Sequence, residues 1–292
     1  MKEELNKICE CRENENLKNY NTYKLDCTCS YIVFPKTVDE LKKVLHVLKE
    51  NNTKYFVIGN GSNIILPNYY DGVIIKLNNF NKIEITENNI YVETGYMLNK
   101  LAILLSDLGY TGMEWATGVP GTIGGSIKGN AGAYKSSMSE IIKDVTVLNN
   151  GEVLTLTNKE LNFGYRTSLI KENKDMIVLS CNIHLEKGNI NEIKNTIKER
   201  TNKRLETQPL NYPSCGSVFR NPEGMSAGKL IDDLGLKGYS IGGAKISEKH
   251  ANFIINYNNA TSKDIIKLID FIKEQIKKNY NIDLVLEQEI IK

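Results

Sequence analysis

The sequence lacks the features that mark several large classes of protein. No segment of its 292 residues approaches the ~20 consecutive apolar residues that cross a bilayer. The charged N-terminus has no apolar core of the kind that a signal peptide carries. Six cysteines are too few for a disulfide scaffold. We therefore expect a soluble protein in the reducing environment of the cytoplasm.

The sequence also lacks a strong charge of either sign. Lys and Arg total 37 against 35 Asp and Glu, which gives a net charge of +2. So small a surplus provides no electrostatic reason to expect nucleic acid or an anionic membrane as a partner. Hydrophobic residues make up 41% and charged residues 25%, which is ordinary for a globular protein and excludes disorder and collagen-like repeats. The length suits two domains or one large one.

Potential metal ligands are sparse. Four of the cysteines form two pairs, Cys9-x-Cys11 and Cys27-x-Cys29, which could offer four thiolates to zinc. Two intervening residues are the more usual spacing, and the alternation around Cys27 and Cys29 favours a buried strand in which both thiols pack as small hydrophobes. We expect free thiols and no metal, with the zinc site as the open alternative. The three histidines are too scattered to indicate a metal site: His46, His184 and His250.

Strand and helix patterns are mixed along the chain, which predicts an α+β protein of two halves. Helices are predicted where apolar residues recur at helical spacing, and two of them begin with capping-box patterns, Thr37 to Glu40 and Thr261 to Asp264. Strands are predicted at 30–34, 55–58, 72–77, 82–86, 90–94, 144–148, 176–185, 252–256 and 284–291. Helices are predicted at 37–48, 98–108, 191–205, 226–235 and 261–276.

Two glycine-dense segments stand out, one at 59–63 and one at 118–134. Neither has the G-x-G-x-x-G spacing of a Rossmann dinucleotide site, and no P-loop pattern is present. Glycine-rich backbone can nevertheless approach an anion closely, and successive N–H groups can bind a pyrophosphate. Two such loops could hold the two ends of a dinucleotide, whereas the alternative is that both are tight turns between strands.

Eight motifs then occur in an order that resembles one known family. The chain is similar to the UDP-N-acetylenolpyruvoylglucosamine reductase (MurB) family over about residues 17 to 292. Each motif alone is weak, but the ordered set is highly specific. The motifs are Asn21-Thr22, VIGNGSNIIL (57–66), GVPGTIGGSIKGNAGAY (118–134), FGYRTS (163–168), PSCGSVFRNP (213–222), AGKLIDDLGLKG (227–238), IGGAKISEKHANFIIN (241–256) and LEQEI (286–290).

The resemblance implies a two-lobed FAD-binding unit of the vanillyl-alcohol-oxidase (PCMH) type followed by an α+β substrate domain. We expect an N-terminal extension at 1–16, the FAD unit at 17–190 and the substrate domain at 191–292. No histidine lies in a glycine loop, so FAD should be bound non-covalently. The implied FAD-binding residues are Gly59, Asn60, Gly61, Ser62, Asn63, Gly118, Pro120, Gly121, Gly124, Gly125, Asn130, Ala131 and Gly132.

The implied reaction is the NADPH-dependent reduction of UDP-N-acetylglucosamine enolpyruvate to UDP-N-acetylmuramate through FAD, in peptidoglycan precursor synthesis. Charge builds on the substrate carboxylate, where the guanidinium of Arg166 would stabilise it. The hydroxyl of Ser217 would deliver the proton that completes the reduction. Glu289 would polarise the intermediate or orient the donor. Strand alternation places Glu289 on the face opposite Gln288.

The remaining expectations concern the family branch, the partners and the residues that bind the UDP-sugar. The segment between FGYRTS and GSVFRNP is short, which indicates the branch without an insertion that carries a substrate-closing tyrosine. His250 is left outside the catalytic set as a residue that buttresses the turn before 252. We expect a monomer whose partners are NADPH and the UDP-sugar. The implied substrate-binding residues are Tyr165, Arg204, Asn221 and Lys229.

Two other functions stay open at this point. One is a different flavin oxidase or dehydrogenase of the same superfamily, acting on a sugar alcohol or lactone with oxygen. The other is a non-catalytic nucleotide-binding module that would bind FAD or a UDP-sugar without oxidising NADPH. The joint presence of Arg166, Ser217 and Glu289 argues against the second.

Overall fold

The computed structural model describes residues 1–292, and the chain divides into two compact units that each combine distant segments. The two units do not coincide with the division at residue 190 predicted from the sequence, which stays a prediction about function. Unit 1 consists of residues 1–13, 31–60 and 72–202. Unit 2 consists of residues 14–30, 61–71 and 203–292.

Two helices of unit 1 pack against a sheet with strand order β1-β2-β5-β3, to which unit 1 contributes β3 and parts of β1, β2 and β5. Leu5 from α1 and Leu41 and Val44 from α2 are buried together with Val73 and Ile75 of β5. Strand β3 runs parallel to β5. The N-terminal residues thus belong to the folded core. The elements are α1 (Lys2–Ile8), β1 (Glu10–Asn16), β2 (Thr28–Phe34), α2 (Val38–Glu50), β3 (Tyr55–Ile58) and β5 (Tyr69–Lys76).

The capping box predicted for α2 is only half formed. The Thr37 hydroxyl accepts the Glu40 N–H at 3.1 Å, as predicted. The Glu40 carboxylate instead accepts the N–H of Lys36 at 2.7 Å. The helix therefore begins where the sequence predicts, with the Glu40 N–H at its N-terminus satisfied and the preceding Lys36 N–H bound as well. The capping box predicted for the helix at 262 is complete.

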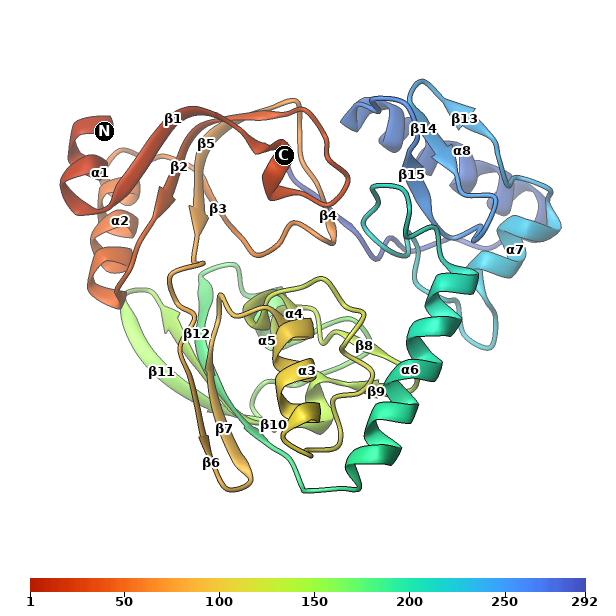
Figure 1. Cartoon of the computed structure of the whole chain (residues 1–292). Coiled ribbons are helices and arrows are strands. Elements are labelled where there is room, and N and C mark those ends of the chain that lie inside the picture. Colours follow the sequence, from red (N-terminus) through yellow and green to blue (C-terminus); the bar gives the residue numbers. More distant parts are fainter. The chain divides into compact units, whose positions relative to one another are not determined.

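The second part of unit 1 is an antiparallel sheet with strand order β11-β10-β12-β7-β6. Helices α3, α4 and α5 pack on one of its faces (Figure 1) and bury Leu101, Ile127 and Ile170 against Val145 and Cys181. The elements are β6 (Ile83–Thr86), β7 (Asn89–Glu93), α3 (Leu98–Asp107), α4 (Ile123–Lys128), β10 (Ile142–Asn149), β11 (Glu152–Thr157), α5 (Leu169–Glu172) and β12 (Met176–His184).

Strands β1 and β11 were not predicted from the sequence, for one shared reason. Both are edge strands of their sheets, and most of their residues are exposed. Strand β1 (ECRENEN) has no apolar alternation at all, and β11 (EVLTLT) buries only Leu156 in part, so neither gives a clear strand pattern. Only the pairing with a neighbouring strand identifies it.

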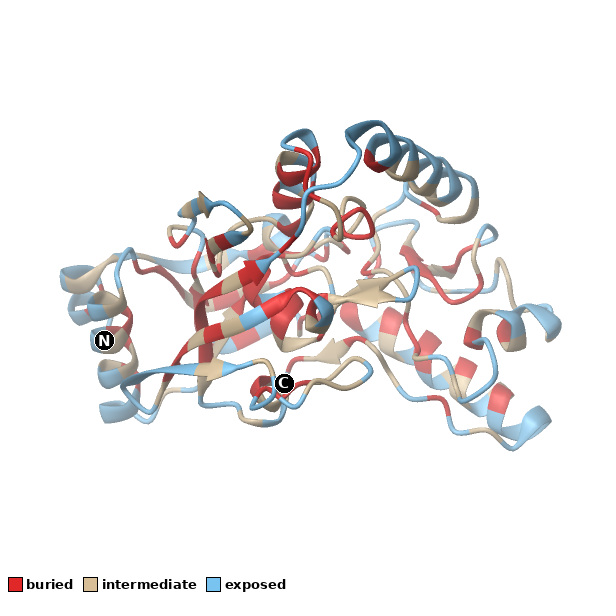
Figure 2. Ribbon diagram, turned by 90° about the horizontal axis from the view of Figure 1, so that it is seen from below, coloured by how far each residue is buried: buried red, intermediate tan, exposed pale blue.

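Unit 2 contains a small sheet of order β13-β14-β15, the helices α7 and α8, and a pair of two-residue parallel strands, β4 and β16. Helix α8 buries one side, and Figure 2 shows helices with buried positions on one side and exposed positions on the other. The elements are β4 (Ile64–Ile65), α7 (Ala227–Asp233), β13 (Ser240–Ile241), β14 (Ala244–Ile246), β15 (Ile254–Asn256), α8 (Ser262–Tyr280) and β16 (Glu289–Ile290).

The strand predicted at 284–291 is much shorter in the structure. Only Glu289 and Ile290 form a ladder with β4, and Leu286 makes an isolated bridge to Phe219. The remaining elements are the long helix α6 (Ile190–Thr207) and four short ones: η1 (Leu17–Tyr20), β8 (Gly132–Ala133), β9 (Ser136–Ser137) and η2 (Met138–Glu140). None of the helices has the length and apolar character needed to cross a membrane.

Candidate active site

The two glycine segments meet in unit 1. The side chain of Asn60 donates to the carbonyl oxygen of Pro120 at 2.7 Å. A Cβ atom on Gly59 would lie 2.6 Å from the hydroxyl of Thr122. Only a residue without a side chain lets the end of β3 approach the 118–122 turn this closely. The structure therefore brings part of the predicted FAD-binding set together.

Part of the predicted second glycine loop is helical. Residues 123–128 form α4, and the Thr122 hydroxyl accepts the Gly125 N–H at its N-terminus. A Cβ on Gly124 would lie 2.0 Å from the Thr94 hydroxyl, so this glycine lets α4 pack against the end of β7. Two glycines in a six-residue helix hide its apolar spacing, which explains why the sequence predicted only a loop.

The chemistry of this region suits an anionic ligand. Segments 57–66 and 116–134 contain neither Asp nor Glu. The ammonium of Lys76 donates to the carbonyl oxygen of Gly59, and burial lowers the pKa of Lys76 to about 8. The backbone N–H groups of Asn60, Gly121 and Thr122 donate to no acceptor in the chain. Uncommitted N–H groups beside a cation, with no carboxylate nearby in the sequence, fit the pyrophosphate of FAD.

Arg166 is fixed by the segment that follows α4. Its Nη2 donates to the carbonyl oxygen of Gly132 at 2.7 Å, and its Nη1 lies 3.4 Å from that of Asn130. The Asn130 amide in turn donates to the Gly164 carbonyl oxygen at 2.9 Å. Arg166 and Asn130 both have positive φ angles, of 59° and 40°. Such conformations are costly for residues other than glycine, and they concentrate at functional sites.

Ser217 lies in unit 2 on a segment held from both sides. Val218 donates its N–H to the carbonyl oxygen of Asn252, and Glu287 donates its N–H to that of Val218, each at 2.9 Å. The preceding Gly216 has a φ of +72°, a turn conformation that favours glycine. The Ser217 hydroxyl makes no hydrogen bond within the chain. It is thus presented on a fixed turn while its proton stays available.

Glu289 lies on the neighbouring segment of the same unit. Its N–H donates to the carbonyl oxygen of Asn63 at 3.0 Å, and the Asn63 amide donates to that of Glu287 at 3.1 Å. Gln288 is buried whereas Glu287 and Glu289 are half-buried. Only Glu289 and Ile290 form a strand, so the alternation expected around Gln288 stays a prediction. Unit 2 therefore holds Glu289 next to Asn63. The bond between Glu287 and Val218 connects the same segment to the one that carries Ser217.

The predicted substrate residues are placed less tightly. The Tyr165 ring is 57% exposed and lies against the Arg166 guanidinium, 5.3 Å from its carbon. The Asn221 side chain accepts the Ala227 N–H at 3.1 Å and so helps to begin α7. The exposed Lys229 forms an ion pair with Asp233 at 2.8 Å. That ion pair partly neutralises the charge that Lys229 would offer to a phosphate.

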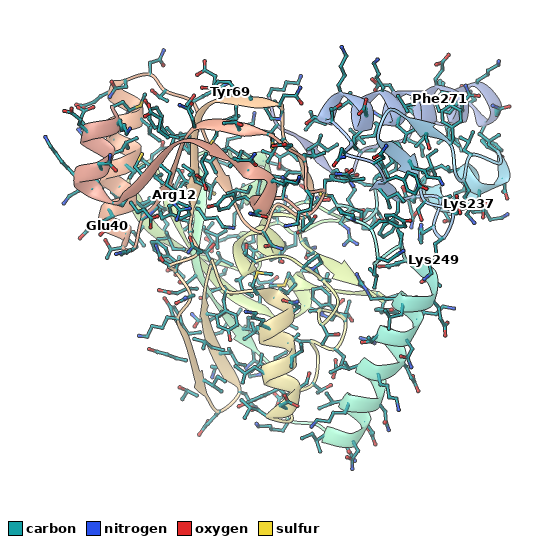
Figure 3. All side chains as sticks on the ribbon, turned by 45° about the horizontal axis from the view of Figure 1, so that its top comes forward. Arg12, Glu40, Tyr69, Lys237, Lys249 and Phe271 are labelled. Carbon is teal, nitrogen blue, oxygen red and sulfur yellow. The ribbon has the colours of Figure 1, made fainter.

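Arg204, the remaining predicted substrate residue, lies in the last turn of α6. The carbonyl oxygen of the next residue, Leu205, accepts a hydrogen bond from the ammonium of Lys249, which is labelled in Figure 3. The end of α6 is therefore anchored within unit 2. All four predicted substrate residues are exposed or half-buried. Their contacts with a ligand stay a prediction.

The sequence interpretation missed the buried polar residues that support Ser217. The Asn252 side chain pairs with both backbone polar groups of Phe219, at 2.8 and 3.0 Å. His250 buttresses this turn, as predicted, because its Nδ1 accepts the Asn252 N–H at 3.2 Å and its ring packs on Phe253. Burial lowers the pKa of His250 from its usual value. The only available signal was an asparagine within an apolar run.

No group of three or more His, Cys, Asp or Glu side chains in the structure could hold a metal ion. The structure thus offers no cluster of ligands for the zinc alternative, and the absence of a metal stays a prediction. Cys27 and Cys29 are buried, and their thiols lie near the backbone oxygens of Leu25 and Glu15. Burial raises the pKa of Cys9 to about 11 and that of Cys27 to about 12, which keeps both protonated.

Comparison with known proteins gives the same answer over the whole chain. The profile of an FAD-binding domain matches residues 29–157. The profile of the C-terminal domain of UDP-N-acetylenolpyruvoylglucosamine reductase matches residues 208–291. The reductase of Anoxybacillus flavithermus is 42% identical over 283 residues, which cover 96% of this chain and 94% of that protein. The reductase of Caldanaerobacter subterraneus is 41% identical, covering 95% and 92%.

The chain belongs to the UDP-N-acetylenolpyruvoylglucosamine reductase family.

A crystal structure from the same family supports the fold. The UDP-N-acetylenolpyruvylglucosamine reductase of Thermus caldophilus superposes with a TM-score of 0.83 at 30% identity, covering 97% of this chain and 99% of that one. The fold is therefore the expected α+β arrangement, a PCMH-type FAD-binding part followed by the C-terminal domain of this reductase family. As a member of the family, the chain is an FAD-dependent oxidoreductase.

Proposed function

We propose that this chain reduces UDP-N-acetylglucosamine enolpyruvate to UDP-N-acetylmuramate with NADPH, as the FAD-dependent reductase (UDP-N-acetylmuramate dehydrogenase) of peptidoglycan precursor synthesis. The observation that carries the proposal is the pair of matches to an FAD-binding domain and to the C-terminal domain of this reductase family in one chain. Family membership also fits the cytoplasmic location expected from the sequence. FAD, when bound, would supply the chemistry for hydride transfer between NADPH and the vinyl CH2 carbon of the substrate.

The glycine segments would hold FAD. Asn60, Gly121 and Thr122 offer backbone N–H groups to its pyrophosphate, and Lys76 adds a positive charge behind Gly59. In unit 2, Gly61, Ser62 and Asn63 continue the first segment, and their backbone N–H groups also donate to no acceptor in the chain. No histidine lies in either segment, so we infer that FAD is bound non-covalently.

Arg166 would bind the carboxylate of the enolpyruvyl group. When hydride reaches the CH2 carbon, negative charge spreads over the adjacent carbon and this carboxylate. A guanidinium stays protonated and forms two parallel hydrogen bonds to a carboxylate, so it stabilises that charge as it develops. The backbone oxygens of Asn130 and Gly132 orient Arg166 before substrate arrives. This preorganisation reduces the cost of ordering a long side chain.

Ser217 would give its hydroxyl proton to the carbanionic carbon next to the carboxylate. A serine hydroxyl is a weak acid, but the acceptor is a strongly basic carbon. The hydroxyl has no partner within the chain, and the Gly216 turn fixes the backbone that carries it. Glu289, half-buried on the neighbouring segment, would polarise the substrate intermediate or orient the donor.

The domain division, the substrate contacts, the family branch and the oligomeric state are part of the same proposal. We assign residues 17–190 to FAD binding and 191–292 to substrate binding, with Tyr165, Arg204, Asn221 and Lys229 as substrate contacts. The short connections around α5, β12 and α6 support the branch without a substrate-closing tyrosine insertion. We also propose a monomer, which light scattering at working concentrations would test by its mass.

A visible absorption spectrum and a turnover assay test the proposal. The purified protein should bind FAD and oxidise NADPH only when the enolpyruvyl substrate is present. No flavin absorbance, even after addition of FAD, would contradict it. Turnover with oxygen in place of the enolpyruvyl substrate would select the superfamily oxidase, and bound FAD without NADPH oxidation would select a binding module.

A further inference from the structure

Tyr23 and Gln288 form a buried neutral pair in unit 2, and Gln288 contacts the backbone of the segment that carries Ser217. Tyr23 is fully buried and Gln288 is 3% exposed. The Tyr23 hydroxyl donates to Gln288 Oε1 at 3.0 Å. Because both side chains are enclosed, neither can contact a substrate. Any effect of the pair on the reaction must therefore pass through the residues that it holds.

The amide of Gln288 contacts the turn that presents Ser217. Its Nε2 lies 3.2 Å from the carbonyl oxygen of Cys215 and 3.4 Å from those of Gly216 and Ser217. The two N–H bonds of this amide are shared among three successive carbonyl oxygens, and together they hold the Gly216 turn. The Tyr23 bond fixes the orientation of the amide, because a flipped Gln288 would direct its own oxygen at these carbonyl groups.

The backbone of Gln288 connects the Tyr23–Gln288 pair to Glu289. Glu289 follows Gln288 directly and begins β16, and it is half-buried whereas Gln288 is buried. The Glu289 N–H donates to the Asn63 carbonyl oxygen, so its position is set independently of its side chain. A single residue therefore connects the Ser217 turn, through its side chain, with Glu289, through its backbone.

Tyr23 is well suited to stay in place as a neutral donor. The Asn256 side chain donates to the carbonyl oxygen of Tyr23 at 2.9 Å. Thr22, which precedes Tyr23, donates its N–H to the Gly61 carbonyl oxygen at 3.1 Å. Burial raises the pKa of Tyr23 well above its usual value, so its hydroxyl remains protonated at any pH at which the enzyme works.

We propose that Tyr23 and Gln288 are positioning residues that set the distance and orientation of Ser217 relative to Glu289 for proton delivery. The inference rests on the proposed roles of those two residues. It predicts a defect confined to the step in which reduced flavin is reoxidised by the substrate. Reduction of the flavin by NADPH needs neither Ser217 nor Glu289 and should proceed normally.

The test is stopped-flow measurement of both half-reactions with Tyr23→Phe, which removes one oxygen atom and leaves Gln288 Oε1 without its donor. Flavin reoxidation by the enolpyruvyl substrate should slow by about 10- to 100-fold, because small misplacements of reacting groups have effects of this size. Flavin reduction and the substrate KM should stay within about twofold of wild type. Gln288→Met should give the same pattern. The double variant should be no slower than the slower single one, because the two residues act as a unit.

Tyr110→Phe is the matched control, since it removes another buried tyrosine hydroxyl, one that donates to the Glu87 carbonyl oxygen in unit 1. It should lower the melting temperature by a similar amount and leave both half-reactions unchanged. Normal reoxidation in Tyr23→Phe beside a strong defect in Ser217→Ala would overturn the positioning role alone. Normal reoxidation in Ser217→Ala would overturn the proposed role of Ser217 and the positioning role together. Equal slowing of both half-reactions by Tyr23→Phe would show a merely structural effect and overturn the inference.

Discussion

The two units hold their candidate functional residues by different physical means. In unit 1, glycines allow close backbone contact, and two cations, Lys76 and Arg166, donate to carbonyl oxygens of the glycine segments. In unit 2, neutral buried side chains such as Gln288 and Asn252 hold short backbone segments through hydrogen bonds. Under the proposed function, unit 1 would bind negative charge and unit 2 would place the proton donor. Substitutions in the two units should therefore affect different measurements.

Ser217→Ala should give the largest effect and test the assignment of proton transfer to unit 2. We expect flavin reoxidation by substrate to slow by about 10²- to 10⁴-fold, the usual contribution of a positioned acid. Flavin reduction by NADPH and the affinity for FAD should not change. Stopped-flow absorbance at the flavin band measures both rates. Ser214→Ala, three residues earlier on the same segment, is the control and should keep both; a similar defect there would point to general disruption of the segment.

Gly61→Ala should give the next largest effect and test how unit 2 depends on its backbone. A Cβ there would lie 2.1 Å from the Tyr20 carbonyl oxygen, on a residue whose φ is +62°. Because a backbone atom cannot easily move aside, we expect a loss of about 3 kcal/mol or more in the free energy of unfolding. Denaturant titration measures it.

Gly216→Ala is the matched control for that prediction. Gly216 has a φ of +72° but open space around its missing Cβ. Only the conformational cost remains, so we expect a loss of about 1–2 kcal/mol. Equal losses at both positions would mean that backbone conformation, and not close packing, makes glycine necessary at Gly61.

Arg166→Lys should break the simple division between the units, since Arg166 belongs to unit 1 but is proposed to act in the same half-reaction as Ser217. A lysine keeps the charge and loses the planar fork, so flavin reoxidation should slow by about 10- to 100-fold with a smaller change in substrate binding. Arg12→Lys is the control, because the half-exposed Arg12 (Figure 3) pairs with Glu10 away from the glycine segments and should leave both rates unchanged. A defect in substrate affinity alone would contradict the proposed role.

Lys76→Met should give the smallest effect and sharpen the assignment of anion binding to unit 1. FAD should bind about tenfold more weakly, a difference of about 1.4 kcal/mol, with little change in either half-reaction at saturating FAD. Because burial lowers the pKa of Lys76 to about 8, the affinity of the wild type should also fall as the pH rises through 8. The variant should lack this pH dependence. Flavin fluorescence titration between pH 7 and 9 measures both, and a pH-independent wild type would contradict the prediction.

The lowered pKa of Lys76 also makes the free energy of unfolding depend on pH. Between about pH 8 and 10.5 the FAD-free folded chain has lost the Lys76 proton while the unfolded chain retains it. The unfolded state then binds more protons, so the free energy of unfolding should rise with pH across this window. This contribution should be absent in Lys76→Met and present in Lys43→Met, which removes an exposed lysine of α2.

The sequence alone determined the family, the cofactor class and most of the helices and buried strands. Ordered motifs identify a family because each encodes a local backbone requirement, such as the glycine before Ser217. Helices α2, α3 and α8 were predictable because a core-facing helix repeats its apolar residues every three or four positions. Ser217, Arg166 and Glu289 were named from motifs, and their catalytic roles stay predictions.

Only the tertiary structure decided what those motifs require from the rest of the chain. Tyr23 and Gln288 are 265 positions apart, and nothing in the sequence near either residue indicates the other. The carbonyl oxygens of Asn130 and Gly132 orient Arg166, although the sequence suggested these residues only for FAD. The edge strands β1 and β11 and the short helix α4 also became visible only through their partners. A hydrogen bond between distant residues depends on the path of the whole chain, whereas periodicity and turn chemistry depend on neighbours in the sequence.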